Sequence, residues 1–254
     1  MLSATVITFN EEKNLSPCLE SLAFADEIIV IDSGSTDRTL EIAKAFTDRV
    51  YQEPWQGYAR QKNLAQERAQ GPWILNVDAD ERVTPALGRE IRALLFRGPE
   101  EAGFRIPRKN YFRGRWIRHG GWYPNYILRL YRKEAGAFAL REVHEQVVVK
   151  GKVGTLKSPL EHFTYDSISD YLKRMEIYSD LSAAQYFREG KQVTWAGVFF
   201  RSFFTFFRMW ILQAGFLDGS DGLVLAVLYS HYTFAKYAKL KERTEGTQGR
   251  PTLS

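Results

Sequence analysis

The most constraining feature of the sequence is a regular alternation of apolar runs and amphipathic segments over residues 2–96. Short apolar, β-branched runs at 2–9, 27–31, 50–51 and 73–77 predict strands, and helical spacing of apolar residues follows each run. Repeated strand–helix units of this kind favour an α/β fold with a parallel sheet covered by helices on both faces. Ligands of such sheets bind beyond the carboxyl ends of the strands. The polar residues that follow the strands are therefore the first candidates for a functional site.

Three of the predicted strands end in polar clusters. Asn10-Glu11 follows the first strand, residues 32–37 follow the second, and Asp78-Ala79-Asp80-Glu81 follows the fourth. Because alternate residues of an extended chain point the same way, Asp78 and Asp80 are expected to converge on one point. Two such carboxylates repel unless a cation lies between them, and a divalent ion with oxygen ligands would remove that repulsion. Each cluster alone also fits a solvated turn or a helix cap, since Asp, Asn and Ser are common in both.

The composition is that of a globular protein, with 44% hydrophobic and 26% charged residues in a chain of 254. This length suits one large domain or a domain with an appendage. A net charge of +5 suggests an anionic partner such as a nucleotide or a lipid headgroup. The single cysteine, Cys18, excludes an internal disulfide and lies on an apolar stripe, where a packed thiol is expected. The first residues lack the basic and apolar regions of a signal peptide.

Beyond Gly98 the pattern changes to strands at 103–107, 125–131 and 143–149 with irregular connections. The stretch from Phe104 to Lys133 contains nine basic residues and no acidic one, interleaved with aromatic residues. Arginine forks suit phosphate, and aromatic faces suit sugar rings, so this stretch is interpreted as an acceptor surface. A solvated basic face remains the alternative. The basic residues are Arg105, Arg108, Lys109, Arg113, Arg115, Arg118, Arg129, Arg132 and Lys133.

The C-terminal part predicts helices with an unusual aromatic content. Residues 167–190 form one amphipathic pattern, and residues 193–238 are the most apolar and aromatic region. Uncharged runs there are too short to span a bilayer. Arg201 and Arg208 are seven residues apart and share one helix face, which suits a helix in the membrane interface. A hairpin buried on the main domain or on a second subunit is the alternative. We expect domains at 1–165 and 166–240 and a polar tail at 241–254.

The strand-end motifs resemble those of a known family. Thr8-Phe9-Asn10-Glu11, Ile31-Asp32-Ser33-Gly34-Ser35-Thr36-Asp37-Arg38-Thr39, Lys62-Asn63 and Asp78-Ala79-Asp80-Glu81 have the order and spacing of family-2 inverting glycosyltransferases. The resemblance covers residues 2–165 and implies the GT-A fold. A more specific resemblance, to small bacterial lipopolysaccharide inner-core β-glucosyltransferases, rests on Gly57-Tyr58-Ala59-Arg60-Gln61-Lys62-Asn63, Arg129-Leu130-Tyr131-Arg132 and Val143-His144-Glu145.

The resemblance implies roles for individual residues in binding the donor. It assigns Asp32 to the uracil ring and Lys62 to the donor diphosphate. It assigns Asp78 and Asp80 to the ribose and a divalent metal, Mg²⁺ or Mn²⁺, with Asp80 the more direct ligand. His162 could be a third metal ligand or a packed or capping histidine. The full set implied for the nucleotide-sugar is Asn10, Glu11, Asp32, Ser33, Asp37, Lys62, Asn63 and Asp78.

The resemblance also implies a general base and an acceptor surface. Inversion needs a carboxylate that deprotonates the acceptor hydroxyl, and Glu145 is the candidate. Its alternative is a surface carboxylate paired with Arg141 or Arg129. His144 could orient Glu145, bind acceptor phosphate or be only structural. The expected acceptor-binding residues are Arg129, Arg132, Trp122 and Tyr123.

The resulting hypothesis is an enzyme that moves a hexose, with glucose from UDP-glucose as the first candidate, onto a lipid-linked acceptor such as the heptose of the lipopolysaccharide inner core. It would work in the cytoplasm, attached peripherally to the inner face of the membrane. A polyprenyl-phosphate glycosyltransferase is the alternative within the same class. A non-catalytic lipid- or sugar-binding module and a nucleic-acid-binding protein are the alternatives outside it, and we expect no nucleic-acid partner. Donor sugar, acceptor hydroxyl and oligomeric state stay open.

Overall fold

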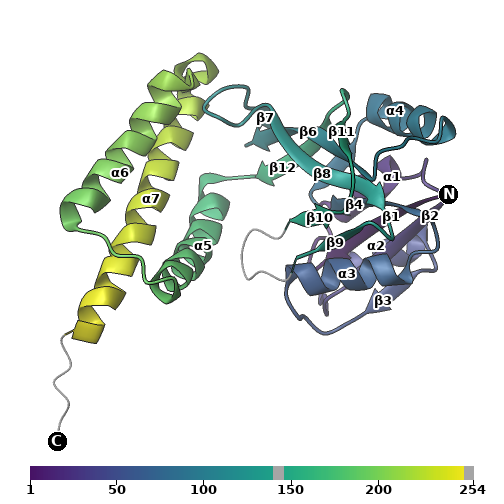
Figure 1. Ribbon diagram of the computed structural model, residues 1–254, viewed down its shortest axis with the longest axis horizontal. Helices are drawn as coiled ribbons and strands as arrows, with labels where there is room; N and C mark the ends of the chain where they lie inside the picture. The colour runs from purple at the N-terminus through teal and green to yellow at the C-terminus, as the bar shows by residue number, and fades with distance from the viewer. Residues whose placement is uncertain (140–145, 249–254) are drawn as a thin grey trace, which may run out of the picture. The chain divides into compact units, whose positions relative to one another are not determined.

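The computed structural model describes residues 1–139 and 146–248 and divides into two compact units (Figure 1). Unit 1 comprises Met1–Asn110 and Pro124–Thr164. Unit 2 comprises Tyr111–Tyr123 and the chain from Tyr165 onward. The segment Tyr111–Tyr123 therefore belongs to the C-terminal unit, although its sequence position suggested the first domain.

Unit 1 is built on a sheet whose first half is parallel, as predicted. Its order is β3 (Val50–Gln52), β2 (Glu27–Asp32), β1 (Leu2–Thr8) and β4 (Trp73–Asp78). The sheet continues with β8 (Asn125–Arg132), antiparallel to β4, then β6 (Gly103–Phe112), β12 (Leu160–Tyr165) and β5 (Glu81–Val83). β7 (Arg115–Trp116) and β11 (Val153–Thr155) pair with β6, while β9 (Gly136–Phe138) and β10 (Val147–Val149) form a separate pair. β1 is buried along its whole length, as a central parallel strand covered on both faces should be.

Helices cover both faces of the parallel half, which confirms the predicted architecture. α1 (Leu15–Ser21), α2 (Thr39–Phe46) and α4 (Pro85–Phe96) contribute to one apolar cluster with residues of β1 and β4. α3 (Tyr58–Arg68) contributes Ala59 and Ala65 to a second cluster, with Ile29 and Ile31 of β2. The two clusters use alternate residues of the same strands, as the two-residue period of a strand requires.

The register of the parallel strands places the predicted polar clusters side by side. Thr8 at the end of β1 pairs with Asp32 at the end of β2. Ile7 of β1 pairs with Asp78 at the end of β4. The residues that follow these three strands therefore emerge at one edge of the sheet.

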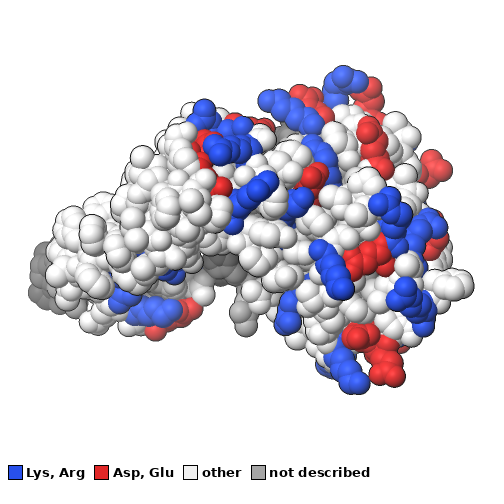
Figure 2. All heavy atoms as spheres, turned by 90° about the horizontal axis from the view of Figure 1, so that it is seen from above, with Lys and Arg blue, Asp and Glu red and all other residues white. Residues whose placement is uncertain are grey.

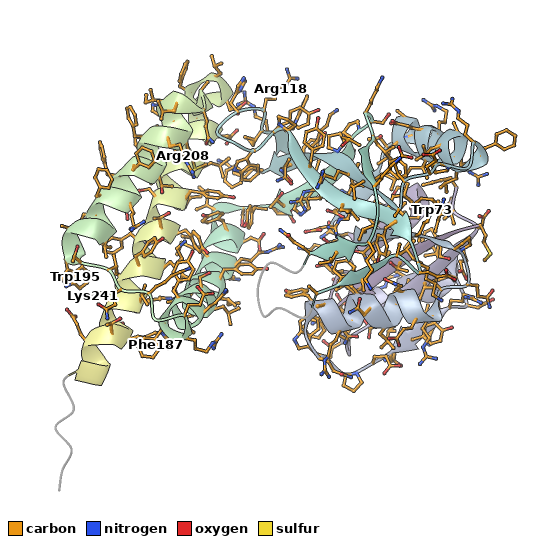
Figure 3. The ribbon with its side chains drawn as sticks, in the orientation of Figure 1. Trp73, Arg118, Phe187, Trp195, Arg208 and Lys241 are labelled. Atoms are coloured by element: carbon orange, nitrogen blue, oxygen red, sulfur yellow. The ribbon has the colours of Figure 1, made fainter. Side chains whose placement is uncertain are left out.

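Unit 2 is mainly helical. It contains α5 (Ile168–Arg188), α6 (Trp195–Phe207), the π-helical turn η1 (Arg208–Leu212), the 3₁₀ turn η2 (Gly215–Asp218) and α7 (Gly219–Gln248). α6 and α5 both pack along α7 (Figure 1). Trp195 lies at the start of α6, and Arg208 lies just after its end (Figure 3). The core of this unit contains Phe112, Trp122, Tyr171, Met175 and Leu225.

The last helix is longer than the sequence suggested. α7 continues to Gln248, so it includes the first part of the segment that we expected to be a polar tail. Lys241 and Glu245 form an ion pair one turn apart, and the Thr244 hydroxyl donates to the Leu240 carbonyl. Pairs at this spacing stabilise a helix even where its residues are polar.

Charged residues are unevenly distributed over one face of the molecule (Figure 2). Seen from above, the left-hand part of the molecule is largely free of charged residues, whereas acidic and basic residues intermingle on the right (Figure 2). Within the described residues, no single helix has the length and hydropathy to cross a bilayer. The segments 195–212 and 215–246, bent by 70° at the break between them, meet those criteria only as a pair, by length and composition.

Candidate active site

The loop after β1 and the loop after β2 are joined by a set of hydrogen bonds. Asn10 has φ of 54°, a left-handed conformation that Asn tolerates better than most residues. Its backbone amide donates to the Ser35 hydroxyl at 2.8 Å, and its side-chain oxygen accepts from the Thr36 amide at 2.8 Å. The Glu11 amide donates to the Thr39 hydroxyl at 2.8 Å. The two loops therefore form one preorganised wall at the edge of the sheet.

Asp32, Ser33 and Asp37 shape the loop after β2. Asp32 is fully buried, and its carboxylate accepts from the Gly34 and Ser35 amides, each at 3.0 Å. The Asp37 carboxylate accepts from the amide of Thr39, the first residue of α2. The Ser35 hydroxyl also donates to this carboxylate, so three of its about four acceptor positions are used within the loop and one remains for a ligand. The Ser33 hydroxyl accepts from the side-chain amide of Gln61 at 3.3 Å.

Asp78 is neutralised by cations of the protein itself. Lys62 Nζ lies 2.8 Å from Asp78 Oδ1, and the Arg129 guanidinium contacts Oδ2. Burial raises the pKa of Asp78, but Arg129 and Lys62 lower it more, so its net pKa lies far below the ordinary value. The sequence suggested that a metal ion relieves the repulsion in this cluster. Lys62 and Arg129 act as counter-ions of Asp78 in this structure. The assignment of Asp78 to a metal stays a prediction.

Glu81 completes the charge cluster and was not a predicted site residue. Its side chain is fully buried. Its carboxylate accepts from Arg129 at 2.8 Å, from Arg108 at 3.1 Å and from the Asp78 amide at 3.0 Å. Arg129 also donates to the Asn76 side chain at 2.9 Å. The position of Glu81 in the strand-end motif was the one sequence signal for a role in the site. Its arginine partners are remote in sequence, so its contacts could not be predicted.

Asp80 lies beside His162, an arrangement that fits either expected role of His162, as a metal ligand or as a packed histidine. Asp80 Oδ2 and His162 Nε2 are 3.4 Å apart, and both side chains are only slightly exposed. The other ring nitrogen, Nδ1, lies 2.8 Å from the Asn110 side-chain oxygen. The Thr164 hydroxyl lies 3.0 Å from the same nitrogen. With the proton on Nδ1, donated to Asn110, Nε2 would offer its lone pair to a metal held beside Asp80. This is the arrangement in which histidine ligates a metal, with its second nitrogen bonded to an oxygen.

One carboxylate oxygen and one imidazole nitrogen fit a partly protein-held Mg²⁺ or Mn²⁺ ion. Such ions keep several positions for phosphate oxygens and water. Within residues 1–139 and 146–248, no group of three or more His, Cys, Asp or Glu side chains is placed to hold a metal. Remaining ligands would therefore come from a bound diphosphate and from water.

Lys62 and Asn63 are neighbours in sequence but have different environments. Lys62 is buried and reaches Asp78, and its ammonium also lies 5.2 Å from the centre of the Phe138 ring. Asn63 was expected to bind the nucleotide-sugar. Instead its side-chain amide donates to the Phe138 carbonyl at 3.0 Å and its oxygen accepts from the Phe138 amide at 2.9 Å. Because Asn63 uses both polar ends to hold β9 against α3, the structure does not support a role for it in binding.

Gln61 is a site residue that sequence reasoning missed. It is buried, and its side-chain amide donates to the Pro54 carbonyl at 2.8 Å and to the Glu53 carbonyl at 3.3 Å, besides Ser33. It thereby fixes the segment before α3 against the loop after β2. A glutamine within a helix gives no sequence signal for such a role.

The four residues expected to bind the acceptor are distributed over both units. Arg129 is buried among carboxylates in unit 1. The Arg132 guanidinium donates to the Glu101 and Pro99 carbonyls. Trp122 is only 5% exposed and lies in the core of unit 2, so an acceptor cannot contact it in this conformation. Tyr123 packs edge-on against Trp116. Arg129, Arg132 and Trp122 are thus engaged within the protein in this structure, and their assignment to the acceptor stays a prediction.

The expected general base lies outside the described residues. Glu145 and His144 fall within residues 140–145, outside the described residues. The described chain resumes at Gln146, whose carbonyl accepts from the Ala139 amide at 3.1 Å. Their roles stay predictions.

Comparisons with known proteins identify the family of this chain. The sequence profile of glycosyl transferase family 2 matches residues 3–154. Lipopolysaccharide core biosynthesis glycosyltransferase LpsC of Rhizobium meliloti (strain 1021) is 34% identical over 264 residues, covering 99% of this chain and 96% of LpsC. An uncharacterized glycosyltransferase, RT0209 of Rickettsia typhi (strain ATCC VR-144 / Wilmington), is 28% identical and covers 95% of this chain and 87% of its own.

A solved structure has a similar fold. The crystal structure of S. aureus TarS 1–349 in complex with UDP-GlcNAc covers 97% of this chain and 92% of its own, with a TM-score of 0.50 and 16% identity. This likeness concerns the fold alone. The family profile covers more than half of the sequence, and LpsC aligns with nearly all of it. This chain therefore belongs to glycosyl transferase family 2.

Proposed function

We propose that this enzyme transfers a hexose from a UDP-sugar to a saccharide of the lipopolysaccharide core, with inversion and with the help of a divalent metal ion. The observation that carries the proposal is the pairing of Asp80 with His162 at the edge where β1, β2 and β4 end. This edge is where an α/β sheet binds its ligand. The name of LpsC supports the core saccharide as acceptor class.

A UDP-sugar suits the wall formed by the two strand-end loops. Asp32, with unused acceptor capacity, would accept from the uracil ring, and the loop containing Ser33 and Asp37 would hold the nucleoside beside Asn10 and Glu11. TarS, which has a similar fold, was solved with UDP-GlcNAc. Glucose from UDP-glucose is our first candidate for the sugar.

Asp80 and His162 would hold Mg²⁺ or Mn²⁺, which supplies positive charge against the charge that develops on departing UDP. Lys62 holds Asp78 in one orientation, so that the Asp78 carboxylate can accept from a ribose hydroxyl. The low pKa of Asp78 keeps that carboxylate ionised and therefore an acceptor. In the proposed reaction, Glu145 removes the proton of the acceptor hydroxyl as it attacks the anomeric carbon, and His144 orients Glu145.

The acceptor class also implies a location. A lipid-linked saccharide is presented at a membrane, so we propose peripheral attachment to the cytoplasmic face of the cell membrane. The exposed aromatic side chains of α6 support this part of the proposal, because aromatic rings concentrate at membrane interfaces.

The decisive experiment measures UDP release from UDP-glucose with deacylated lipopolysaccharide core as acceptor, with added Mg²⁺ or Mn²⁺ and with a chelator. Asp80→Asn removes a proposed ligand and should abolish metal-dependent release. Asn110→Ala removes one of the two partners of His162 Nδ1, the other being the Thr164 hydroxyl, and should weaken Mn²⁺ binding about 10- to 100-fold. Asp48→Asn is the matched control, since Asp48 is exposed in the turn between α2 and β3. Near-full turnover by Asp80→Asn would refute the metal assignment.

A further inference from the structure

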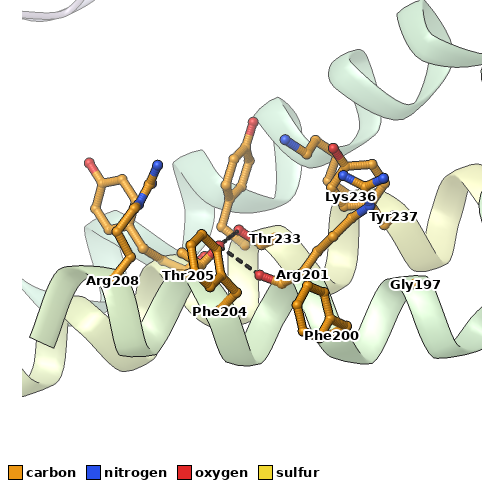
Figure 4. Close-up of a pocket in the computed structure, with 11 residues that line it drawn as sticks. Gly197, Phe200, Arg201, Phe204, Thr205, Arg208, Thr233, Lys236 and Tyr237 are labelled. Carbon is orange, nitrogen blue, oxygen red and sulfur yellow. Dashed lines mark hydrogen bonds between the residues drawn. The ribbon is translucent and has the colours of Figure 1, made fainter. Parts of the chain in front are cut away.

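A pocket with a volume of about 540 Å³ lies between α6 and α7 in unit 2 (Figure 4). Three cationic side chains line it: Arg201, Arg208 and Lys236. The side chains of Arg201 and Arg208 extend to the same side of α6 (Figure 4). The Thr205 and Thr233 hydroxyls lie 3.2 Å apart on the wall between the helices. Both hydroxyls donate to backbone carbonyls of their own helices, so the three cations are the groups of this lining that suit a phosphate.

These three cations have no acidic partner in the described parts of the chain. None of the described residues that line the pocket is acidic, and no described carboxylate lies within ion-pair distance of any of the three. Arg201 and Lys236 instead lie over the Tyr237 ring, at 5.0 and 4.9 Å from its centre. Burial lowers the pKa of Lys236, and the positive charges of Lys191 and Arg201 lower it further. An anion in the pocket would relieve this repulsion.

The rest of α7 shows that the absence of carboxylates is local. Lys239 lies three residues after Lys236 in α7. It pairs with Glu176 at 2.8 Å and with Asp180 at 3.2 Å. At the start of α7, Asp221 pairs with both Arg113 and Arg115. Basic residues of unit 2 are therefore compensated near both ends of α7, whereas those of the pocket are not.

The pocket borders an exposed apolar face of α6. Phe199, Phe200 and Phe203 are 59%, 68% and 68% exposed, whereas Val198 and Ser202 on the opposite side are buried. Large apolar side chains gathered on one helix face mark a surface for a protein or a membrane. A helix with such a face and with arginines along its border is the arrangement of helices that lie in a membrane interface.

We propose that the pocket formed by Arg201, Arg208 and Lys236 binds the phosphate of an anionic phospholipid while the phenylalanines of α6 enter the surrounding bilayer. A phospholipid satisfies both features at once. When the apolar face of α6 is inserted into the bilayer, the guanidinium groups of the bordering arginines lie at the depth of the lipid phosphates. Free phosphate would use the cations and leave the phenylalanines exposed. A second copy of the chain would cover the phenylalanines but, through the same basic face, would bring cations toward cations.

This inference deepens the membrane part of the proposed function, and its test uses neither donor nor acceptor, so a failure of sugar transfer is a separate result. The experiment is flotation of the full chain with vesicles of phosphatidylcholine alone and of phosphatidylcholine mixed with phosphatidylglycerol. Each basic residue near an anionic surface contributes about five-fold to binding. The triple variant Arg201→Gln, Arg208→Gln, Lys236→Gln should therefore bind the anionic vesicles roughly 100-fold more weakly.

The matched control is Lys44→Gln, Arg89→Gln, Arg97→Gln, which removes the same residue types from exposed positions of unit 1. This control should keep the preference for anionic vesicles. If it loses as much vesicle binding as the triple variant, the attraction is non-specific and the proposed lipid site is refuted. Unchanged binding by the triple variant would also overturn it. Circular dichroism checks folding, and the double variant Arg201→Gln, Arg208→Gln, which changes only exposed side chains, gives the same test if the triple variant unfolds.

Two further measurements separate the alternative occupants. Phe200→Ser with Phe203→Ser should weaken binding to both vesicle types, because these residues contribute apolar burial rather than charge. If inorganic phosphate equal in concentration to the lipid phosphate displaces the protein from the vesicles, the site is for free phosphate and the proposal fails. If ultracentrifugation shows a dimer that the phenylalanine variant abolishes and the vesicles do not bind, a second copy occupies the face instead.

Discussion

At the scale of single residues, the structure shows how one carboxylate of the Asp78-Ala79-Asp80 motif differs from the other. Asp78 is held by Lys62 and Arg129, whereas Asp80 lies beside a histidine. The first is therefore a fixed, ionised acceptor, and the second is suited to a metal. The same two residues in a turn would be interchangeable, so the difference comes from their neighbours in the fold.

Lys62→Met tests the first of these environments. The substitution keeps most of the apolar contact with Phe138 but leaves Asp78 with one counter-ion fewer in a largely buried site. Removing one partner of a buried ion pair typically costs about 3–5 kcal/mol in free energy of unfolding, and we expect a loss near 3 kcal/mol because Arg129 remains. Urea denaturation measures this loss.

Two comparisons make the Lys62 result specific. Adding Asp78→Asn should recover part of the lost stability, since no uncompensated carboxylate then remains. Lys152→Met removes a lysine whose ion pair with Glu100 is mostly exposed, and it should change stability by less than about 1 kcal/mol. Equal losses of unfolding free energy in Lys62→Met and Lys152→Met would show that the buried Lys62–Asp78 pair stabilises the fold no more than an exposed pair does.

Asn63→Ala distinguishes the structural role of Asn63 from the binding role that the sequence suggested. Its two hydrogen bonds to the Phe138 backbone join α3 to β9. Their loss should lower the free energy of unfolding by about 1–3 kcal/mol. The Kd for UDP, measured by calorimetry on the folded variant, should stay within about two-fold of the parent. A ten-fold weaker affinity would return Asn63 to the nucleotide site.

Residue types at strand ends could be read from the sequence, but their partners could not. The motifs correctly placed Asp32, Asp78 and Asp80 at one edge of the sheet. The contacts of Arg129 and Arg132 within the protein were not predicted, because an arginine suited to phosphate is equally suited to carboxylates and carbonyls. The distinction depends on long-range contacts, such as that between Arg129 and Asp78, which local patterns do not contain.

At the scale of elements, Glu27 at the start of β2 joins several strands at the edge of the sheet opposite to the site. Burial raises the pKa of its carboxyl, but hydrogen bonds from the Ser3 hydroxyl and the Gln70 and Gly71 amides, together with Arg49, lower it more. The net pKa is therefore below its ordinary value of 4.5. Because the folded state binds this proton less readily than the unfolded chain, Glu27 contributes stability above pH 4.5.

We expect that contribution to disappear as the pH falls from about 4.5 through the lowered pKa of the folded state. Glu27→Gln should therefore lower the free energy of unfolding at neutral pH and flatten its dependence on pH below about 4.5. Urea denaturation of both proteins between neutral and acidic pH checks this. Glu100→Gln, at an exposed carboxylate, should leave the dependence unchanged. A steeper acid dependence in Glu27→Gln would show that the sign is wrong.

The longer elements were predictable from the sequence, and the short ones were not. β1, β2 and β4 are apolar runs long enough to show a pattern, and α5 has clear amphipathic spacing. β7, β9 and β11 contain only two or three residues, and their hydrogen bonds depend on where β6 and β10 pass. The end of α7 was missed because its polarity suggested a tail, although its charge spacing suits a helix.

At the scale of the whole molecule, the chain combines two units that we expect to respond to different ligands. Most of residues 3–154, which the family profile matches, lie in unit 1, and this unit contains the strand-end loops and the Asp80–His162 pair. The pocket between α6 and α7 lies in unit 2. The sequence predicted both the sheet and the aromatic helices. It could not predict that residues 111–123 pack with the helices, since this depends on bonds such as those from the Arg118 and His119 amides to Asp218.

Amide hydrogen exchange should separate the two ligand responses within one protein. UDP with Mn²⁺ should slow exchange in residues 10–12, 33–37 and 78–81, because a ligand that binds only the folded state stabilises it by about 2.7 kcal/mol at one hundred times its Kd. Vesicles containing phosphatidylglycerol should slow exchange in residues 195–212 instead. In Asp80→Asn, protection by UDP with Mn²⁺ should weaken while protection by the vesicles stays. In the triple pocket variant, protection by the vesicles should weaken while protection by UDP with Mn²⁺ stays. Loss of both protections in either variant would mean that the substitution disturbs the fold rather than one site.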